Sequence, residues 1–219
     1  MKKHLRLACA LLSLLPAPLA AACAPYDYSA RVSEVRSDLF LAETEAFTLT
    51  VACVSREYPY ADDGIPCPMT DTLEASLAPK GDAPAAVEIY ADGTGWGGEA
   101  SFSAVYGEYR FSEGVSAFPE GTLSLRVVWG EEEISLAVTS VRTEQTLTPE
   151  EALAAFTAAE KETLKRMQKE GAFCGELCIR LLRRDKNYYY AAVTDGTERT
   201  ALLLDGETGE VLARRTDVL

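Results

Sequence analysis

Cysteine is the residue type with the most evident chemical potential in this chain of 219 residues, which contains six cysteines. Cys53 and Cys67 enclose a loop of 15 residues that is rich in turn-forming residues. A disulfide across a loop of that length would stabilise the fold by about 3 kcal/mol through chain entropy. We therefore predict a structural disulfide between Cys53 and Cys67.

A second pair of cysteines, Cys174 and Cys178, is also a predicted disulfide. Four residues of extended strand span about 13 Å, whereas bridged Cα atoms lie about 5.5 Å apart, so the pair forms only if Gly175 bends the chain. The alternatives are two free thiols or a link to another part of the molecule. The spacing is not Cys-x-x-Cys and no helix N-terminus would lower a thiol pKa, so we expect no redox-active dithiol.

Histidine is represented by His4 alone, which lies in a segment that we expect to be removed. A mature chain without histidine has no Ser-His-Asp or Cys-His unit, no imidazole proton shuttle and no histidine-ligated zinc. We therefore predict that the protein is not an enzyme and has no catalytic residues. A hydrolase that uses two carboxylates is not excluded, because acidic residues are abundant. No spacing, however, selects two of them as a catalytic pair.

Two further patterns resemble ligand-binding motifs, but we interpret neither of them as a binding site. The stretch 93–98 matches G-x-G-x-x-G, but a strand follows it instead of the helix that would face a pyrophosphate, which favours a glycine-rich hairpin loop. The acidic groups 62–63 and 131–133 lack the spacing of a calcium-binding loop and are interpreted as solvated charge. We expect neither a metal nor a cofactor.

The N-terminus has the layout of a secretory signal over residues 1–22, with three basic residues, an apolar run at 7–15 and then small residues. The segment LAAAC, which ends at Cys23, resembles a bacterial lipobox, in which cleavage precedes a cysteine that carries diacylglycerol. The usual pattern has Leu three residues before the cysteine, where this chain has Ala20. Lipidation of Cys23 would explain the odd number of mature cysteines. The alternatives are cleavage by an ordinary signal peptidase with release of a secreted protein, and an uncleaved N-terminal anchor.

Charge is unevenly distributed along the mature chain, which has 34 acidic and 18 basic residues and a net charge of −16. Residues 24–146 contain 21 acidic and 7 basic residues, whereas residues 147–219 contain 13 and 11. No basic stripe is present that would neutralise phosphates, so we expect no nucleic-acid partner. The change in charge near residue 147 indicates two domains.

The first of these, residues 23–146, has the pattern of an all-β domain. Apolar and polar residues alternate with period two, as in half-buried strands, at 47–54, 123–129 and 133–139. Further strands are expected at 28–36, 73–77, 85–90 and 101–110. We predict a β-sandwich, and the segment LSLRVVWGEEEISLAVTSV resembles a bacterial immunoglobulin-like domain.

The second predicted domain, residues 147–219, begins with a capping box at Thr148-Pro149-Glu150-Glu151. Apolar residues then recur at helical spacing, and Gly171 is the expected end of the helix. Strand-turn-strand patterns follow, with Asp-Gly turns between β-prone runs. We predict an α+β domain in which one helix covers a three- or four-stranded antiparallel meander.

The tail YYYAAVTDGTERTALLLDGETGEVLARR resembles the C-terminal half of a PepSY-type domain, whose strand pairs commonly end in a turn such as the one at 205–210. The resemblance covers about a third of the chain. The sequence departs from the family at Gly206, where a small residue with a side chain is common, and in having one helix-plus-sheet unit where many members have two. The resemblance implies an extracytoplasmic regulatory or protein-binding module, in some members a peptidase inhibitor.

Aromatic residues are the candidates for a binding surface. Trp96 lies in the glycine-rich loop, and Tyr188 and Tyr190 belong to a strand whose three consecutive tyrosines must alternate between its faces. We predict a lipid-anchored extracytoplasmic protein that binds a protein or peptide at the bacterial envelope without catalysis. The alternatives are a solute- or cation-binding lipoprotein and a carboxylate-based hydrolase.

Overall fold

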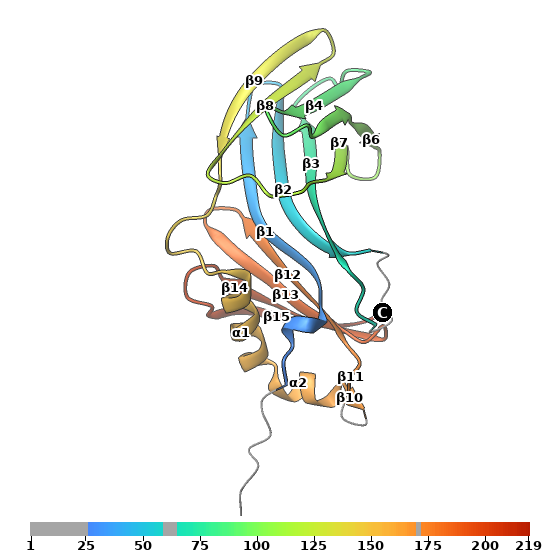
Figure 1. Cartoon of the computed structure of the whole chain (residues 1–219), viewed down its shortest axis with the longest axis vertical. Helices are drawn as coiled ribbons and strands as arrows, with labels where there is room; N and C mark the ends of the chain where they lie inside the picture. Colours follow the sequence, from blue (N-terminus) through green and yellow to red (C-terminus); the bar gives the residue numbers. More distant parts are fainter. Residues whose placement is uncertain (1–25, 59–64, 170–171) are drawn as a thin grey trace, which may run out of the picture.

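The computed structural model describes residues 26–58, 65–169 and 172–219. Cys23, Asp62 and Asp63 lie outside the described residues. The protein is mostly β, as predicted, and its strands form two large sheets (Figure 1).

The larger sheet has nine strands, and its members come from both ends of the chain. They are β1 (Val32–Glu43), β2 (Phe47–Glu57), β3 (Met69–Pro79), β6 (Ser101–Ser103), β7 (Glu108–Gly114), β12 (Glu176–Arg183), β13 (Asn187–Thr194), β14 (Glu198–Asp205) and β15 (Val211–Val218). Their order across the sheet is β15-β14-β13-β12-β1-β2-β3-β7-β6.

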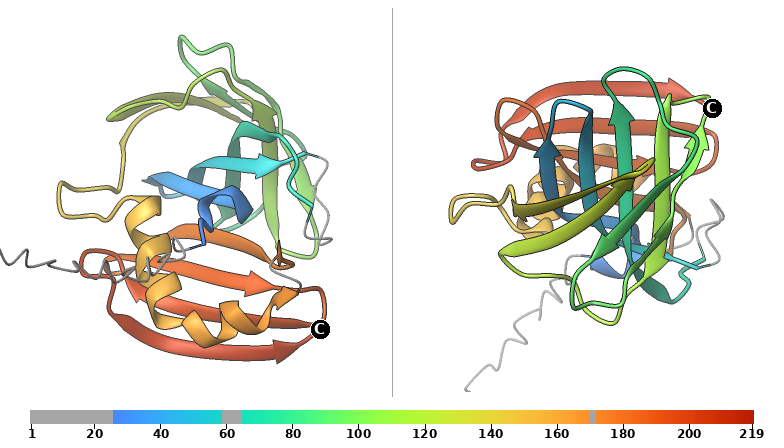
Figure 2. Two further views of the ribbon diagram at one scale, coloured as in Figure 1. Left: turned by 60° about the horizontal axis from the view of Figure 1, so that its bottom comes forward. Right: turned by 90° about the horizontal axis from the view of Figure 1, so that it is seen from above.

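The smaller sheet has four strands in the order β5-β4-β8-β9. They are β4 (Val87–Ala91), β5 (Gly97–Glu99), β8 (Thr122–Trp129) and β9 (Glu132–Thr139). This sheet stacks on the β1–β3 part of the larger sheet (Figure 2), and a buried apolar cluster that includes Phe40, Phe47, Leu73, Ile89 and Leu125 fills the space between them. The region 26–146 is therefore built from two β-sheets around one core. Its closer likeness to immunoglobulin domains stays a prediction.

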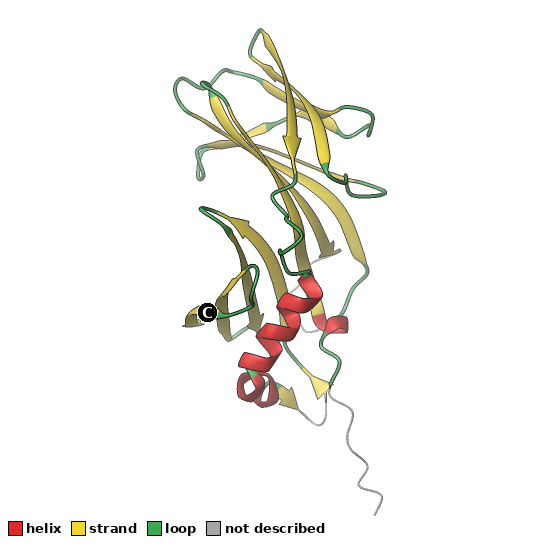
Figure 3. Ribbon diagram, turned by 90° about the vertical axis from the view of Figure 1, so that its left-hand side faces the viewer, coloured by secondary structure: helices red, strands yellow, loops and turns green. Residues whose placement is uncertain are grey.

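The remaining elements are short. They are η1 (Ser29–Arg31), α1 (Pro149–Ala159), α2 (Lys161–Arg166), β10 (Gln168–Lys169) and β11 (Ala172–Phe173). The two α-helices lie on one face of the antiparallel meander β12-β13-β14-β15 (Figure 3), across a second apolar cluster that includes Phe156, Leu164, Leu177, Tyr189 and Leu202.

The capping box predicted at the start of α1 is confirmed. Glu151 N donates to Thr148 Oγ1 at 3.2 Å, and Thr148 N donates to the Glu151 carboxylate at 2.8 Å. The prediction of one unbroken helix is wrong, because the helical segment divides at Glu160. The buried Glu160 carboxylate accepts hydrogen bonds from Arg214 at 2.7 Å and from Thr163 at 2.6 Å, which fixes the chain at the break.

A parallel ladder between β1 and β12 joins the two halves of the chain. It runs from the Val32–Leu177 pair to the Arg36–Arg180 pair. The two large apolar clusters separate close to the predicted boundary at residues 146 and 147, but the sheet continues without interruption from one half to the other. The division into two domains stays a prediction.

A β-bulge in β1 lets this strand serve both halves. The register of β1 against β2 shifts between Arg36 and Asp38, and a bulge changes the face to which the following side chains point. Arg142 holds the bulge from outside the strand: its guanidinium donates to Ser37 O at 3.1 Å and to Tyr189 Oη on β13 at 3.0 Å. The same guanidinium also donates to Leu147 O at 3.2 Å, so one side chain ties β1, β13 and the segment before α1 together.

Within the described ranges, no helix is both long enough and apolar enough to cross a membrane.

Candidate functional site

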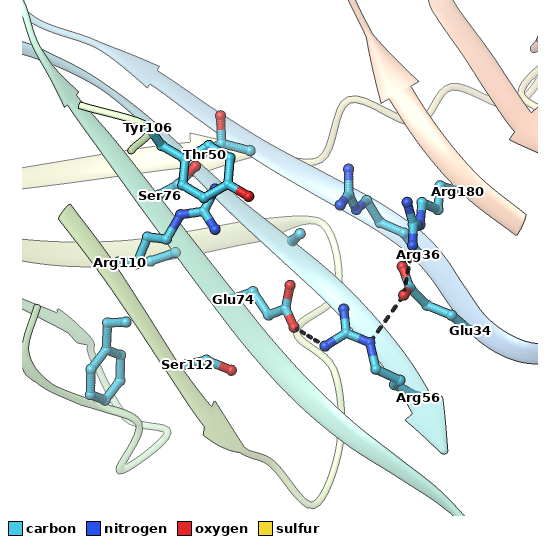
Figure 4. A pocket seen from close by; sticks show the side chains of 13 residues that line it. Glu34, Arg36, Thr50, Arg56, Glu74, Ser76, Tyr106, Arg110, Ser112 and Arg180 are labelled. Carbon is cyan, nitrogen blue, oxygen red and sulfur yellow. Dashed lines mark hydrogen bonds and ion pairs between the residues drawn. The ribbon is translucent and has the colours of Figure 1, made fainter. Parts of the chain in front are cut away.

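A groove of about 680 Å³ lies on the nine-stranded sheet, on the face turned away from the two large apolar clusters (Figure 4). Five elements contribute side chains to it: β1, β2, β3, β7 and β12, with the turn before β7. This volume lies within the range of ligand-binding pockets. The lining is mainly polar and consists of Glu34, Arg36, Thr50, Ala52, Arg56, Glu74, Ala75, Ser76, Tyr106, Arg110, Phe111, Ser112 and Arg180.

Strand alternation explains why these side chains share one face. On β3, Leu73 and Leu77 belong to the apolar cluster between the sheets, so Glu74 and Ser76 point to the opposite side. On β12, Leu177 and Ile179 pack beneath the helices, and the intervening positions turn away from them. The side chains of the groove therefore occupy the polar positions of the strands whose alternating apolar positions form the two cores.

Glu34 is the centre of an ion-pair network on the floor of the groove. Its carboxylate is 4% exposed and accepts two hydrogen bonds from Arg180, at 2.5 and 3.0 Å, and one from Arg56 at 3.0 Å. Arg56 also donates to Glu74 at 2.9 Å. Burial raises the pKa of Glu34, but the hydrogen bonds and charges of Arg180 and Arg56 outweigh burial and leave the pKa below its ordinary value.

Arg36 lies beside this network without a partner in it. Its Nε atom is buried and has no hydrogen-bond partner, and its guanidinium forms no ion pair with any residue that the structure describes. Burial lowers the pKa of Arg36 and the charge of Arg180 lowers it further, whereas the charges of Glu34 and Glu74 offset part of this shift. A partly desolvated guanidinium that forms no ion pair of its own with the described residues is costly, so the site favours an added anion.

Arg110 and Tyr106 form the far wall of the groove. The Arg110 guanidinium lies 3.8 Å from the centre of the Tyr106 ring, which is the geometry of a cation–π contact. Arg110 also pairs with Glu108 at 2.5 Å, and its side chain is 48% exposed. This wall therefore presents an aromatic ring and a charge to solvent together.

The groove concentrates the few cations of an acidic region. Its lining contains four arginines and two glutamates. Three of these arginines come from residues 24–146, which have only 7 basic residues in all. The expectation that the chain lacks a basic cluster holds for the linear sequence and is corrected for the folded molecule. Because arginines pair with Glu34 and Glu74, the arrangement is suited to binding an anion. Glu34, whose pKa is lowered, is a poor proton donor.

The predicted disulfide between Cys53 and Cys67 is not formed, since both are free thiols. Cys53 is fully buried and pairs across the sheet with Leu73, whereas the β2–β3 ladder ends at the Glu57–Met69 pair. Cys67 therefore lies six positions along β3 from the residue opposite Cys53, a separation of about 20 Å in an extended strand. Burial, with the charges of Asp38 and Asp71, raises the pKa of Cys53 to about 12.

Cys174 and Cys178 are also free thiols, so the second predicted disulfide is absent as well. Cys178 lies within β12, opposite Ala192, and Cys174 N donates to Met167 O at 3.1 Å in the segment before the strand. Gly175 does not bring the two thiols together. Its backbone packs closely against the Phe173 ring and Thr194 O, which leaves no room for a side chain at this position. Burial raises the pKa of Cys178.

The three aromatic candidates differ in their positions. Trp96 is not the exposed contact that was predicted: it is 3% exposed, its ring centre lies 5.0 Å from that of Phe111, and its indole donates to Leu73 O at 3.2 Å. Tyr188 and Tyr190 are half-buried on the face opposite the fully buried Tyr189, as the alternation predicted. Tyr190 lies near the groove, with its ring centre 5.9 Å from the Arg180 guanidinium carbon.

The amino-acid sequence alone does not reveal the groove, because its residues are isolated positions in five different strands and one turn. Arg36, Arg56, Arg110 and Arg180 share no motif and no spacing. A weak signal was present, since three of the seven basic residues of the acidic region occupy positions on β-prone segments where a polar residue alternates with apolar ones. That signal identifies a face of a strand, but it does not identify which strands are neighbours.

Comparison with family models, with curated proteins and with solved structures found no match to this chain. No group of three or more His, Cys, Asp and Glu side chains within the described part of the chain is arranged to hold a metal ion.

Proposed function

We propose that the protein is a non-catalytic binding protein of the bacterial envelope, anchored to the membrane through a lipid on Cys23, and that it binds a segment of a protein or peptide in the groove. The observation that carries this proposal is Arg36, a partly desolvated guanidinium that forms no hydrogen bond or ion pair of its own with the described residues, inside a groove of about 680 Å³. A fold that keeps such a group next to a filled ion-pair network favours a ligand that completes it.

The chemistry of the lining supports binding more than catalysis. Glu34 accepts hydrogen bonds from both Arg56 and Arg180, which favours its ionised form. A carboxylate-based glycosidase needs one carboxyl group that stays protonated to act as an acid. The pKa of Glu34 is lowered instead of raised, and Cys53, with its pKa of about 12, is a poor nucleophile.

The excess charge of the groove supports an anionic ligand over a cation. Four arginines face two glutamates in the lining, and a metal ion would meet repulsion from Arg36 and Arg180 at the buried end. The cation-binding alternative therefore has less support than a ligand that contains a negative charge. The negative charge of the mature chain as a whole continues to oppose a nucleic-acid partner.

A groove-filling variant tests this proposal. Ser76 lies on β3 in the lining, and Ser76→Trp would occupy the groove, whereas Ser135→Trp places the same side chain at an exposed position of β9 in the smaller sheet. We expect wild-type protein and the Ser135 variant to retain the same envelope partner in quantitative co-purification, and the Ser76 variant to lose it. Equal recovery by all three folded proteins would contradict the proposal.

The anchor has its own test. Mass spectrometry of protein from the membrane fraction should detect Cys23 as the N-terminal residue with a diacylglyceryl group. Recovery of the chain from the culture medium with an unmodified N-terminus would instead support the secreted form.

A further inference from the structure

The two ends of the groove differ in chemistry, and this difference defines what a ligand must present. One end, at β1 and β12, contains the unpartnered Arg36 beside the Glu34 network. The other end, at the turn before β7, exposes Val105 and Tyr106, whose exposed fractions are 88% and 65%, whereas Phe102 on β6 packs on Tyr109 on the opposite face. Neighbouring apolar side chains with this degree of exposure mark an interaction surface more often than isolated ones do.

Arg36 favours a single carboxylate. A guanidinium presents a planar fork of N–H donors that matches a carboxylate in two parallel hydrogen bonds. Arg180 and Arg56 already donate to Glu34, so Arg36 is the guanidinium at this end that lacks a described partner. A phosphate group with nearly two charges would need more than one vacant cation and would be repelled by Glu34 and Glu74. One guanidinium without a described partner therefore fits a ligand group with one negative charge.

The distance between the two ends sets the spacing of the ligand groups. Arg36 lies on β1 and Arg110, which stacks on Tyr106, lies on β7, three strands away in the order β1-β2-β3-β7. Neighbouring strands are about 4.8 Å apart, which gives about 14 Å across the sheet. The register places Arg36 opposite Gly114, through Val54 and Thr72, so Arg110 also lies four residues along β7, about 13 Å, from that position. The two ends are therefore about 20 Å apart, which corresponds to about six residues of an extended peptide at about 3.3 Å per residue.

We infer, resting on the proposed function, that the groove recognises an extended peptide segment in which a carboxylate binds Arg36 and an apolar side chain about six residues away packs on Tyr106. The carboxylate is a Glu or Asp side chain or a chain terminus of the partner protein. The remaining contacts come from the polar floor between the two ends, where Thr50, Ser76 and Ser112 offer hydroxyl groups.

Selection from a displayed library of random ten-residue peptides, with the chain purified from residue 23 onward, tests the inference. We expect the enriched peptides to share an acidic residue and an apolar residue about six positions apart. A labelled peptide with this motif should lose at least tenfold in affinity when its acidic residue is replaced by the matching amide. It should lose a similar factor on Arg36→Met, and the two losses should not add, because both remove the same contact.

Controls separate the inference from the proposed function. Arg126→Met removes an arginine from the smaller sheet, where it stacks on Tyr90 outside the groove, and should leave affinity unchanged. Inorganic phosphate at the concentration of the peptide should not compete. Enrichment of peptides without acidic residues, competition by phosphate, or unchanged affinity in a folded Arg36 variant would each overturn the inference and leave the proposed function standing. Failure of the wild-type chain to enrich any peptide would count against the proposed function itself.

Discussion

Two nearly buried glutamates, Glu34 in the groove and Glu160 at the helix break, are both bound by arginine and differ in the charges around them. Glu160 forms its ion pair with Arg214, and Thr163 completes its hydrogen bonds. The nearby Arg166 pairs with Glu198, so the charges balance. Glu34 meets Arg180 and Arg56, with Arg36 beside them lacking a described partner. The contact between arginine and carboxylate is the same in both places. An excess of cations, and not the ion pair itself, therefore distinguishes a candidate binding site from a structural contact.

The largest effect is expected from Glu34→Gln. This change removes the charge that Arg180 and Arg56 share, and it should lower the free energy of unfolding by about 2–3 kcal/mol, less than for a fully buried pair because both arginines are partly exposed. Denaturant unfolding measures the loss. Added sulfate should restore part of it by acting as a replacement anion. A loss no larger than that of Glu160→Gln would remove the distinction between the two sites.

A smaller loss of about 1 kcal/mol is expected from Glu160→Gln, because the Arg214 side chain is 50% exposed and regains solvation when its partner is neutral. Sulfate should not restore this loss, since no further cation without a described partner lies at the break. The same unfolding experiment, with and without sulfate, provides the comparison. Restoration equal to that of the Glu34 variant would show that anion rescue is not specific to the groove.

Arg36→Met should raise the free energy of unfolding by about 0.5–1 kcal/mol in the absence of ligand. The methionine replaces a partly desolvated charge with an apolar side chain of similar length. Arg126→Met is the matched control and should cause little change, because this exposed arginine already contacts Glu133 and the Tyr90 ring. Destabilisation by Arg36→Met would mean that this guanidinium has a structural role.

The smallest effect concerns pH. The pKa values of Glu34 and Glu160 are both lowered in the folded protein, so each stabilising contribution is present above the ordinary pKa of 4.5 and is lost as the pH falls through the folded value. The stability difference between wild type and either glutamine variant should therefore narrow on acidification. Thermal unfolding measured near neutrality and near pH 3 tests this, and a difference that widens in acid would contradict it.

Local patterns predicted the elements of this fold well. The capping box at Thr148 and the alternation around Tyr189 depend on residues that are close in sequence, and both are confirmed. The hairpin of β8 and β9 was predicted from the same kind of pattern. Each of these features is determined by interactions within one or two elements, which is why a short stretch of sequence contains the information.

The features that were missed depend on which distant elements become neighbours. The β1–β12 ladder pairs strands from opposite ends of the chain, and the sequence of neither strand indicates which strand it will pair with. The helix break at Glu160 depends on Arg214 in the last strand. The groove depends on the same long-range pairing, because Arg36 and Arg180 become adjacent only when β1 and β12 align. The disulfide predictions failed for a related reason, since loop length alone did not reveal the register of β2 and β3.

The parallel ladder between β1 and β12 also determines the order in which the molecule can be assembled. Ser33 donates to Leu177 O, a partner 144 residues away. The segment Val32–Arg36 of β1 therefore stays an unpaired strand edge on this side until almost the whole chain has been synthesised. Closing such a long loop is entropically slow, and an open edge invites pairing with other chains. A nascent or truncated chain that ends before residue 176 is therefore the form most prone to self-association. The C-terminal strands prevent this by covering the edge of β1.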